Sequence, residues 1–334
     1  MRSEHEVPQA LLPKASRVLV AISGGQDSQC LLRLLVDLRD KWRWQLHSVH
    51  CNHLWRPDAD ANAQFVAQLS KEWGVTCTVK TATQPPGSEA DARRWRYQTF
   101  ASVAQKQGCT HVVTGHTASD RAETLLYNLL RGSGADGLQA LTRQRPLGEN
   151  APDISLVRPL LDVTRAQTAQ FCQDYAIPVW QDATNADLTY ARNRLRLEVL
   201  PLLRTHFNPQ VDVTLAQTAE ILTAEVTYLS QAAQHLFDRC VKGDAIQRRL
   251  LQEAPLALQR RVLRQVLCQR LPTHPQFEHI EKLVALLHAS NRSQTDPFPG
   301  GAIAYVEDPW IKFNHSPSSV PSVGIVTDPQ TPSE

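Results

Sequence analysis

A short loop with two adjacent glycines has the residue types that bind phosphate. In Ser23-Gly24-Gly25-Gln26-Asp27-Ser28, the glycines follow an apolar run and precede a leucine-rich segment. The run predicts a strand, and the leucine spacing predicts a helix. Glycines let the backbone turn tightly, and a helix N-terminus offers unpaired N–H groups with a positive dipole end. The hydroxyls of Ser23 and Ser28 add donors, so the loop is predicted to cradle phosphate oxygens.

Asp27 is the exception in this loop, because a carboxylate repels phosphate. Its presence is explained if Asp27 holds Mg²⁺, which then bridges to the phosphates. The loop has neither the Gly-Lys-Ser/Thr of a Walker A motif nor the spacing of a dinucleotide fingerprint. A glycine turn with Ser and Asp as helix caps is the plain structural alternative. The complete loop between a strand and a helix favours phosphate binding over that alternative.

A pair of carboxylates forms the second group with chemical potential. Asp120 and Glu123 are spaced i, i+3, which places them on one face of a helix near its N-terminus. They follow Gly115 and His116, which come directly after a predicted strand. The pair is suited to holding an ammonium group or to helping bind a metal. The alternative is that they are an N-cap and first-turn acids.

Cationic side chains gather in three further segments. His53 and Arg56 follow the second predicted strand, whose carboxyl end lies beside the ligand crevice of an open α/β sheet. Residues 87–97 and 192–204 are rich in arginine, and the second of these has four arginines against one glutamate. Such segments suit phosphate or an RNA backbone, although a solvated helix face has the same composition.

The elements that must position these groups alternate along the first half of the chain. Strands alternating with helices predict an open parallel sheet with helices on both faces and right-handed crossovers. The predicted strands are 17–23, 44–51, 76–80 and 111–114, and the predicted helices are 27–40, 57–73, 89–107 and 119–131.

The pattern changes after Gly132. We predict an exposed loop at 144–152, an edge strand at 156–160 and a smaller, mostly helical second domain beginning near 207–210. Its helices are predicted at 211–237, 246–271 and 277–290, after one at 164–175, and a terminal hairpin at 302–306 and 310–313. The domain boundaries are then an extension at 1–16, a catalytic domain at 17–208, a helical domain at 209–315 and a disordered Ser/Pro-rich tail at 316–334.

Composition excludes several classes of protein. The chain has 334 residues and a formal net charge of +2, so it is not a polyelectrolyte, although residues 248–270 carry six arginines and one glutamate. The seven cysteines include no Cys-x-x-Cys pair, which argues against a disulfide scaffold, a zinc ribbon and an iron–sulfur cluster. No run approaches the ~18 apolar residues of a membrane span, so a soluble cytoplasmic protein is expected.

The motifs resemble a known family. Ser-Gly-Gly-x-Asp-Ser after the first strand is similar to the pyrophosphate-binding loop of the N-type ATP pyrophosphatases (PP-loop enzymes). Within that superfamily, four further stretches resemble tRNA(Ile)-lysidine synthetases. They are 50–57, 87–97, 114–134 and 181–203. The sequence departs from the family at Leu54-Trp55, where Gly-Leu is frequent, and at Arg121, where Gln is usual.

The resemblance implies a function for each motif residue. It implies ATP binding by the loop 23–28 together with His53, Arg56, Gly115 and His116, with Mg²⁺ on Asp27. It implies lysine binding by Asp120 and Glu123. The implied catalytic residues are Asp27, Asp120, Glu123 and Arg192, and the implied tRNA contacts are Arg93, Arg96, Arg131, Arg192, Arg194 and Arg196.

The implied reaction ligates L-lysine to C2 of the wobble cytidine of tRNA(Ile) with a CAU anticodon, through an adenylated cytidine, with release of AMP and pyrophosphate. No membrane partner is expected, and the resemblance allows a homodimer. Three alternatives stay open from the residues alone: a tRNA thiolase of the same superfamily, an amidotransferase-type synthetase with a glutaminase partner, and a catalytically inactive tRNA-binding protein. Scattered cysteines disfavour the first, and the intact loop and carboxylates disfavour the last.

Overall fold

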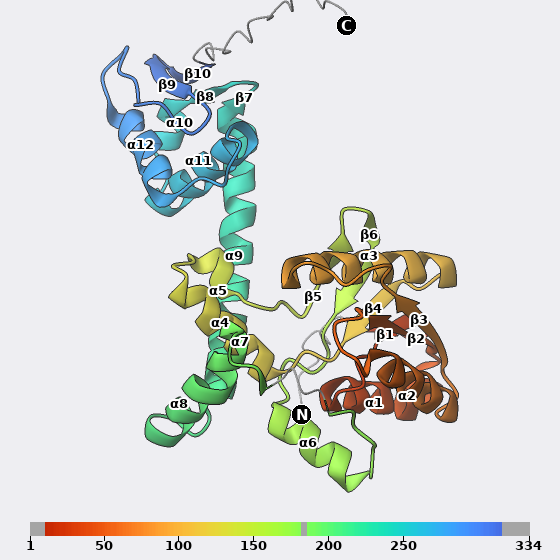
Figure 1. Cartoon of the computed structure of the whole chain (residues 1–334). Helices are drawn as coiled ribbons and strands as arrows, with labels where there is room; N and C mark the ends of the chain where they lie inside the picture. Colours follow the sequence, from red (N-terminus) through yellow and green to blue (C-terminus); the bar gives the residue numbers. More distant parts are fainter. Residues whose placement is uncertain (1–10, 182–185, 316–334) are drawn as a thin grey trace, which may run out of the picture. The chain divides into compact units, whose positions relative to one another are not determined.

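The computed structural model describes residues 11–181 and 186–315 (Figure 1). The expected disordered tail, most of the expected N-terminal extension and the motif residues 182–185 lie outside these ranges. Two compact units divide after Ala224, and each is described by itself. Within the described ranges, no helix combines the length and the apolar character needed to cross a membrane.

A six-stranded sheet forms the centre of the first unit. Its strand order is β3-β2-β1-β4-β6-β5, and the first five strands in this order run parallel. Val20 of β1, for example, pairs with Ser48 of β2 on one side and with Val113 of β4 on the other. The parallel sheet predicted from the alternating pattern is confirmed. The strands are β1 (Arg17–Ala21), β2 (Gln45–Asn52), β3 (Thr76–Thr81), β4 (His111–Thr114), β5 (Gln144–Gly148) and β6 (Ala151–Val157).

Helices cover both faces of this sheet because the apolar run of β1 serves two cores. Val18 and Val20 face α1 (Gln26–Trp42) and α2 (Ala59–Glu72), whereas Leu19 faces α3 (Glu89–Gln107). Alternate residues of a strand point to opposite faces, and all three side chains are fully buried. Figure 1 shows α3 on one face of the sheet and α1 with α2 on the other.

Two sequence predictions for the end of the sheet are wrong. The stretch 144–152 is not an exposed loop, because β5 and β6 form an antiparallel hairpin there. The edge strand is β5, and β6 lies inside the sheet between β5 and β4. Leu147 and Leu156 are buried against α3, so separated apolar residues are enough to anchor the hairpin. Pro146 is tolerated because β5 is an edge strand.

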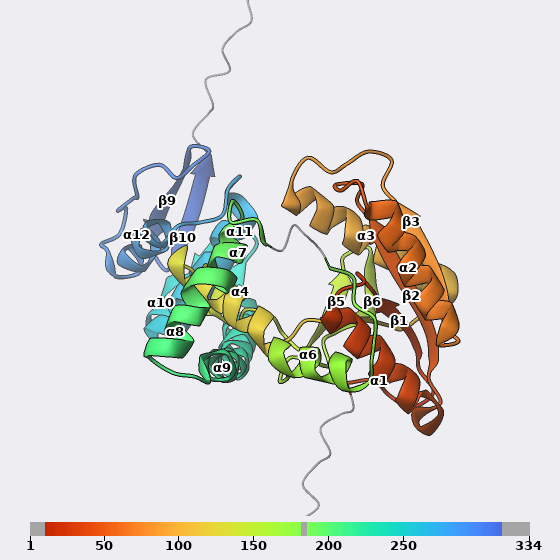
Figure 2. The same cartoon turned by 60° about the horizontal axis from the view of Figure 1, so that its bottom comes forward.

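Short helices complete the first unit and lead out of it. Thr164 caps α6 (Arg165–Asp174) in a capping box with Gln167, and α6 packs beside α1 (Figure 2). A π-helical turn, η2 (Leu195–Val199), interrupts the helical segment around residue 196. The other helices are α4 (Ala118–Leu130), α5 (Ala135–Leu138), α7 (Ala191–Arg194), α8 (Leu200–His206) and α9 (Val211–Cys240), and the division between the units falls within α9.

The second unit is mainly helical, with a four-stranded sheet of order β7-β8-β10-β9. The predicted continuous helix at 246–271 is wrong, because Ile246 lies in a strand and Pro255 starts a new helix. The predicted terminal hairpin is confirmed by β9 and β10. The elements are β7 (Val241–Lys242), β8 (Ala245–Gln247), α10 (Arg248–Gln252), α11 (Leu256–Arg270), α12 (Phe277–His288), β9 (Ala302–Glu307) and β10 (Trp310–His315).

Several arginines of this unit are engaged within it. Arg248 is buried and donates to the carbonyls of Leu287 and Ala289 at the end of α12. Arg249 pairs with Asp308, Arg260 pairs with Glu281, and Arg270 packs over the ring of Phe313. Much of the positive charge that the sequence concentrates at 248–270 therefore stabilises the unit itself.

Candidate active site

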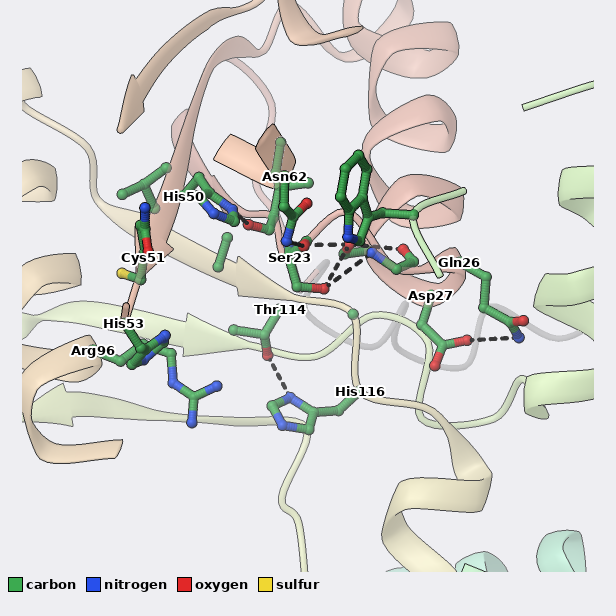
Figure 3. Close-up of a pocket in the computed structure, with 18 of the residues that line it drawn as sticks. Ser23, Gln26, Asp27, His50, Cys51, His53, Asn62, Arg96, Thr114 and His116 are labelled. Carbon is green, nitrogen blue, oxygen red and sulfur yellow. Dashed lines mark hydrogen bonds between the residues drawn. The ribbon is translucent and has the colours of Figure 1, made fainter. Parts of the chain in front are cut away.

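A cavity of about 670 Å³ opens at the carboxyl ends of the parallel strands of the first unit. It lies where β1 has β2 on one side and β4 on the other, which is the switch point at which open α/β sheets bind ligands. The glycine loop, the ends of β2 and β4, one side of α3 and Trp180 line it. Figure 3 shows Asp27 and Gln26 on one side of the cavity and His53 with Arg96 on the other.

The glycine loop is held in a shape that only glycine permits. Gly24 has a φ of +91°, and a Cβ there would lie 2.5 Å from Asn62 Oδ1. Asn62 Nδ2 donates to the Ser23 carbonyl at 3.1 Å, and the Trp180 amide donates to the Gly24 carbonyl at 2.9 Å. The two serine hydroxyls lie 3.2 Å apart. These hydrogen bonds hold the loop in its bent conformation.

The first turn of α1 is available to an anion. Gly25 is its N-cap and supplies no side-chain cap, and the first helical bond is from the Gln29 amide to the Gly25 carbonyl. The amides before Gln29 thus have no partner within the helix. Gly115 allows the β4 end to pack close to this turn, since a Cβ there would lie 2.8 Å from the Asp27 carbonyl oxygen. These features support the predicted phosphate cradle.

Asp27 is bound by groups from α6. Its carboxylate accepts from Arg165 Nε at 3.2 Å and from the hydroxyl of Thr168. Burial raises the pKa of Asp27, and the neighbouring Arg165 opposes that rise. The carboxylate is thus held in place by a cation more than a hundred residues away in sequence.

Asp120 and Glu123 share three arginines. Glu123, which is fully buried, accepts from Arg165 Nη1 at 3.0 Å, Arg192 Nε at 3.0 Å and Arg196 Nε at 2.8 Å. Asp120 Oδ1 accepts from Arg165 at 2.9 Å and Arg192 at 3.2 Å. Burial alone would raise the pKa of Asp120, but Arg165, the nearby histidine and Arg192 hold it below its ordinary value.

The helix-cap interpretation of Asp120 is also correct. Its second oxygen, Oδ2, accepts from the Thr117 amide and hydroxyl, both at 2.8 Å, in a capping box. One carboxylate oxygen therefore fixes the start of α4 while the other faces the arginines. The carboxyl groups of Asp27, Asp120 and Glu123 therefore lie among the guanidinium groups of Arg165, Arg192 and Arg196.

The two predicted histidines are neutral. Burial lowers the pKa of His116 to about 3, and its Nδ1 lies 2.8 Å from Thr114 Oγ1 (Figure 3). Burial and the adjacent Arg96 lower the pKa of His53 to about 4. Neither imidazole offers a positive charge to phosphate at neutral pH, so any contact with ATP is a neutral hydrogen bond or a stacking contact. Arg56 pairs with Asp58 at 3.2 Å.

The lowered pKa of His116 predicts a stability change with pH. The pKa of this histidine in the folded chain lies below its ordinary value of 6.5. As the pH falls, the histidine therefore takes up a proton in the unfolded chain before it does so in the folded chain. The free energy of unfolding consequently falls as pH drops below about 6.5. We expect His116→Gln to flatten this decline in denaturant unfolding measured between pH 7 and about pH 4. His206→Gln, at an exposed position, is the control. An unchanged slope in His116→Gln would contradict the assignment.

The structure brings together most of the predicted site residues. The glycine loop, His53, Arg56, Arg93, Arg96, Gly115, His116, Asp120 and Arg196 line the cavity. Glu123 and Arg192 join it through the carboxylate cluster. Arg131 instead packs over Tyr127, and Arg194 donates to the Leu188 carbonyl, and neither is among the lining residues.

Sequence reasoning missed Arg165, which contacts all three carboxylates. One signal was present in the sequence. Thr164 and Gln167 have the spacing of a capping box, which places Arg165 in the first turn of a helix. A cation is disfavoured at that end of the helix dipole, so its presence implies acidic partners elsewhere. Asn62, Thr168 and Trp180, which support the loop, have no such local signal.

Comparisons with known proteins agree with this geometry. The PP-loop domain family matches residues 2–203, and the TilS substrate binding domain matches residues 246–301. Together with the sheet and the glycine loop, the first match defines the class of protein: a PP-loop protein. A curated tRNA(Ile)-lysidine synthase from Nostoc sp. is 55% identical over 93% of this chain and 93% of its own length. Another, from Thermosynechococcus vestitus, is 51% identical over 91% and 88%. The chain belongs to the tRNA(Ile)-lysidine synthase family.

A solved structure shares the fold at low sequence identity. The U34-tRNA thiolase from Methanococcus maripaludis, determined with its 4Fe–4S cluster, aligns with a TM-score of 0.54 and 14% identity. The alignment covers 64% of this chain and 74% of the thiolase. At this identity the likeness concerns the fold alone.

Proposed function

We propose that this chain ligates L-lysine to C2 of the wobble cytidine in tRNA(Ile) bearing a CAU anticodon, at the expense of ATP. The cytidine O2 attacks the α-phosphate and pyrophosphate leaves. The ε-amine of lysine then attacks C2 and AMP leaves. The modified tRNA reads AUA in place of AUG. The observation that carries this proposal is that one cavity is lined both by the glycine loop, which leads into an α1 N-terminus without a side-chain cap, and by Asp120, which shares Arg165 with the buried Glu123.

ATP is the substrate that the loop accommodates. The first-turn amides of α1 and the hydroxyls of Ser23 and Ser28 are donors for its pyrophosphate portion. The adenylated O2 of cytidine is a far better leaving group than the unmodified ring carbonyl oxygen. Binding of the substrates and neutralisation of phosphate charge therefore do most of the catalytic work.

Mg²⁺ fits the side chains at this place. Mg²⁺ is commonly held by one or two carboxylates together with phosphate oxygens. Asp27 and Asp120 both line the cavity and both contact the guanidinium of Arg165. When bound, Mg²⁺ would neutralise phosphate charge. Asp27 and Asp120 would hold Mg²⁺ in exchange for one of their contacts with arginine. Among the described residues, no cluster of three or more His, Cys, Asp or Glu side chains suits a metal held by protein alone.

Lysine binding requires an exchange of cations. Asp120 and Glu123 already contact three guanidinium groups, so the substrate ammonium must replace at least one of them. Arg192 and Arg196, which come from a segment predicted to contact tRNA, are the candidates for release. The low pKa of Asp120 suits it to orient a cation. A proton acceptor for the ε-amine is required as well, because an ammonium cannot attack.

A sulfur-transfer reaction fits the site less well. The cavity-lining thiol of Cys51 has its pKa raised to about 12 by burial, and burial also raises that of Cys30, beneath the loop, to about 12. Thiols with such values are protonated at neutral pH and are poor nucleophiles. The ligase proposal needs no thiolate.

The proposal is tested by following lysine into RNA. With ATP and Mg²⁺, we expect radiolabelled lysine to enter a tRNA(Ile) transcript with a CAU anticodon, with AMP formed in equal amount. A transcript with uridine at the wobble position is the control and should stay unlabelled. A chain that forms neither AMP nor labelled RNA with the CAU transcript would refute the proposal.

A further inference from the structure

Trp55 presents a fixed, partly open aromatic ring at the mouth of the cavity. The residue lines the cavity, and 47% of it is exposed. Its indole N–H donates to the Pro86 carbonyl at 2.9 Å, which fixes the plane of the ring. One face stacks on His53, with ring centroids 5.3 Å apart and an interplanar angle of 26°. Close to half of the residue stays exposed, so part of the ring is accessible to a flat ligand.

His53 supports the ring of Trp55 by stacking against it. The edge of His53 meets Trp95 at 5.0 Å and 73°, so the three rings form one packed group. The low pKa of His53 keeps it uncharged at neutral pH, and the stack is therefore one of neutral aromatic rings. The support explains how Trp55 keeps its orientation while almost half exposed.

The backbone before Trp55 adopts an uncommon conformation that sets the direction of the ring. Leu54 has a φ of +58°, in the left-handed region that favours glycine. The Leu54 amide donates to Asn52 Oδ1 at 3.0 Å, and Asn52 Nδ2 donates to Asp60 at 2.7 Å. These two hydrogen bonds of Asn52 hold the turn, although leucine is not the residue type that this conformation prefers.

Arginines line the cavity together with Trp55, and the phosphate loop lies across the cavity from its neighbour His53. Arg56, Arg93 and Arg96 line the same cavity as Trp55. Figure 3 places His53 and Arg96 on the side away from Asp27, and Trp55 stacks on His53. A flat aromatic surface beside arginines is the pattern that binds single-stranded RNA, with bases on the ring and phosphates on the cations.

We propose that Trp55 stacks an unpaired base of the anticodon loop, next to the wobble cytidine. The inference rests on the proposed function and adds to it a residue that receives RNA. When the wobble base enters the cavity, it no longer stacks on the adjacent bases of the anticodon loop. One adjacent base then stacks on Trp55 instead. The adenine of ATP is the other base available, but its phosphates are expected at the loop, on the opposite side.

The proposal is tested with two binding measurements. We expect Trp55→Ala to weaken binding of a CAU anticodon stem-loop RNA by on the order of 10- to 100-fold, the effect of removing one base–aromatic stack. Trp55→Phe should retain most of the affinity. The Kd for ATP in the absence of RNA should stay within about twofold. Tyr175→Ala is the matched control, because Tyr175 is 60% exposed and packs against the ring of Phe171 but does not line the cavity.

Stem-loops with one abasic nucleotide identify the base. One abasic RNA lacks the base on the 5′ side of the wobble cytidine, and the other lacks the base on the 3′ side. Trp55→Ala and the original chain should bind equally to the one that lacks the base stacked by Trp55. The proposal is overturned if RNA affinity in Trp55→Ala is unchanged, if only ATP binding is weakened, or if neither abasic RNA cancels the difference. Failure of lysine incorporation with the stacking effect intact would count against the ligase proposal and not against RNA stacking.

Discussion

Asp27→Asn is expected to reduce tRNA-dependent pyrophosphate release by about 10²–10³-fold, the scale of losing one preorganised charge in an active site. Asparagine keeps the size of the side chain and one acceptor oxygen, for either Thr168 or Arg165, but it loses the second acceptor and the charge that would hold Mg²⁺. Binding of tRNA should change less than about twofold, because Asp27 lies in the phosphate cradle. The measurements are pyrophosphate release with saturating tRNA and a separate tRNA Kd.

Folding should tolerate this change. Burial raises the pKa of Asp27, so the folded chain already disfavours its charged form, and a neutral side chain of the same shape removes that cost. The control is Asp40→Asn, since 99% of the Asp40 side chain is exposed. Normal pyrophosphate release by Asp27→Asn would exclude the proposed Mg²⁺ role. A large loss of thermal stability would show that the charge holds Arg165 rather than the nucleotide.

Glu123→Gln is expected to lower the free energy of unfolding by about 3–5 kcal/mol, the usual cost of breaking a buried ion pair. Glu123 is fully buried and accepts four hydrogen bonds from three arginines. Glutamine removes the charge and turns an amide donor toward a guanidinium. The arginine cluster then has one uncompensated positive charge. Urea unfolding at neutral pH measures the change.

The same variant separates the two chemical steps. Lysine incorporation should fall by at least about 100-fold, because the ammonium loses a partner, while tRNA-dependent AMP transfer should fall much less. Glu198→Gln is the control, since Glu198 lies in η2 near Arg196 but is exposed. Equal losses in both steps would mean that Glu123 acts only by supporting the fold of the cavity. Unchanged stability would mean that Arg165, Arg192 and Arg196 are satisfied without it.

Local sequence patterns predicted the elements that place the site. The apolar run of β1 and the leucines of α1 bracket the glycine loop, and their order alone puts the loop at the carboxyl edge of a sheet. The i, i+3 spacing of Asp120 and Glu123 likewise fixed that they share a helix face. These predictions depend only on residues close in sequence, where backbone geometry leaves few choices.

The β5–β6 hairpin shows where local patterns are not enough. Its apolar residues are separated by polar and turn residues, so the stretch has the composition of a loop. It forms a hairpin because Leu147, Ile154 and Leu156 pack against α3 and because β6 pairs with β4. The surface that pairs with it is made by residues far earlier in the chain.

The sequence by itself determined that this protein has a phosphate loop, a carboxylate pair and a supply of arginines. The tertiary structure decided which arginine meets which acid. Arg165 reaches Asp27, Asp120 and Glu123 only because α6 packs beside α1, and Arg192 with Arg196 turn inward instead of toward solvent. Side chains of this length reach many partners, and the choice among them depends on packing between elements distant in the chain. Burial of the carboxylates then strengthens their attraction to the chosen arginines, because water screens a buried charge less than an exposed one.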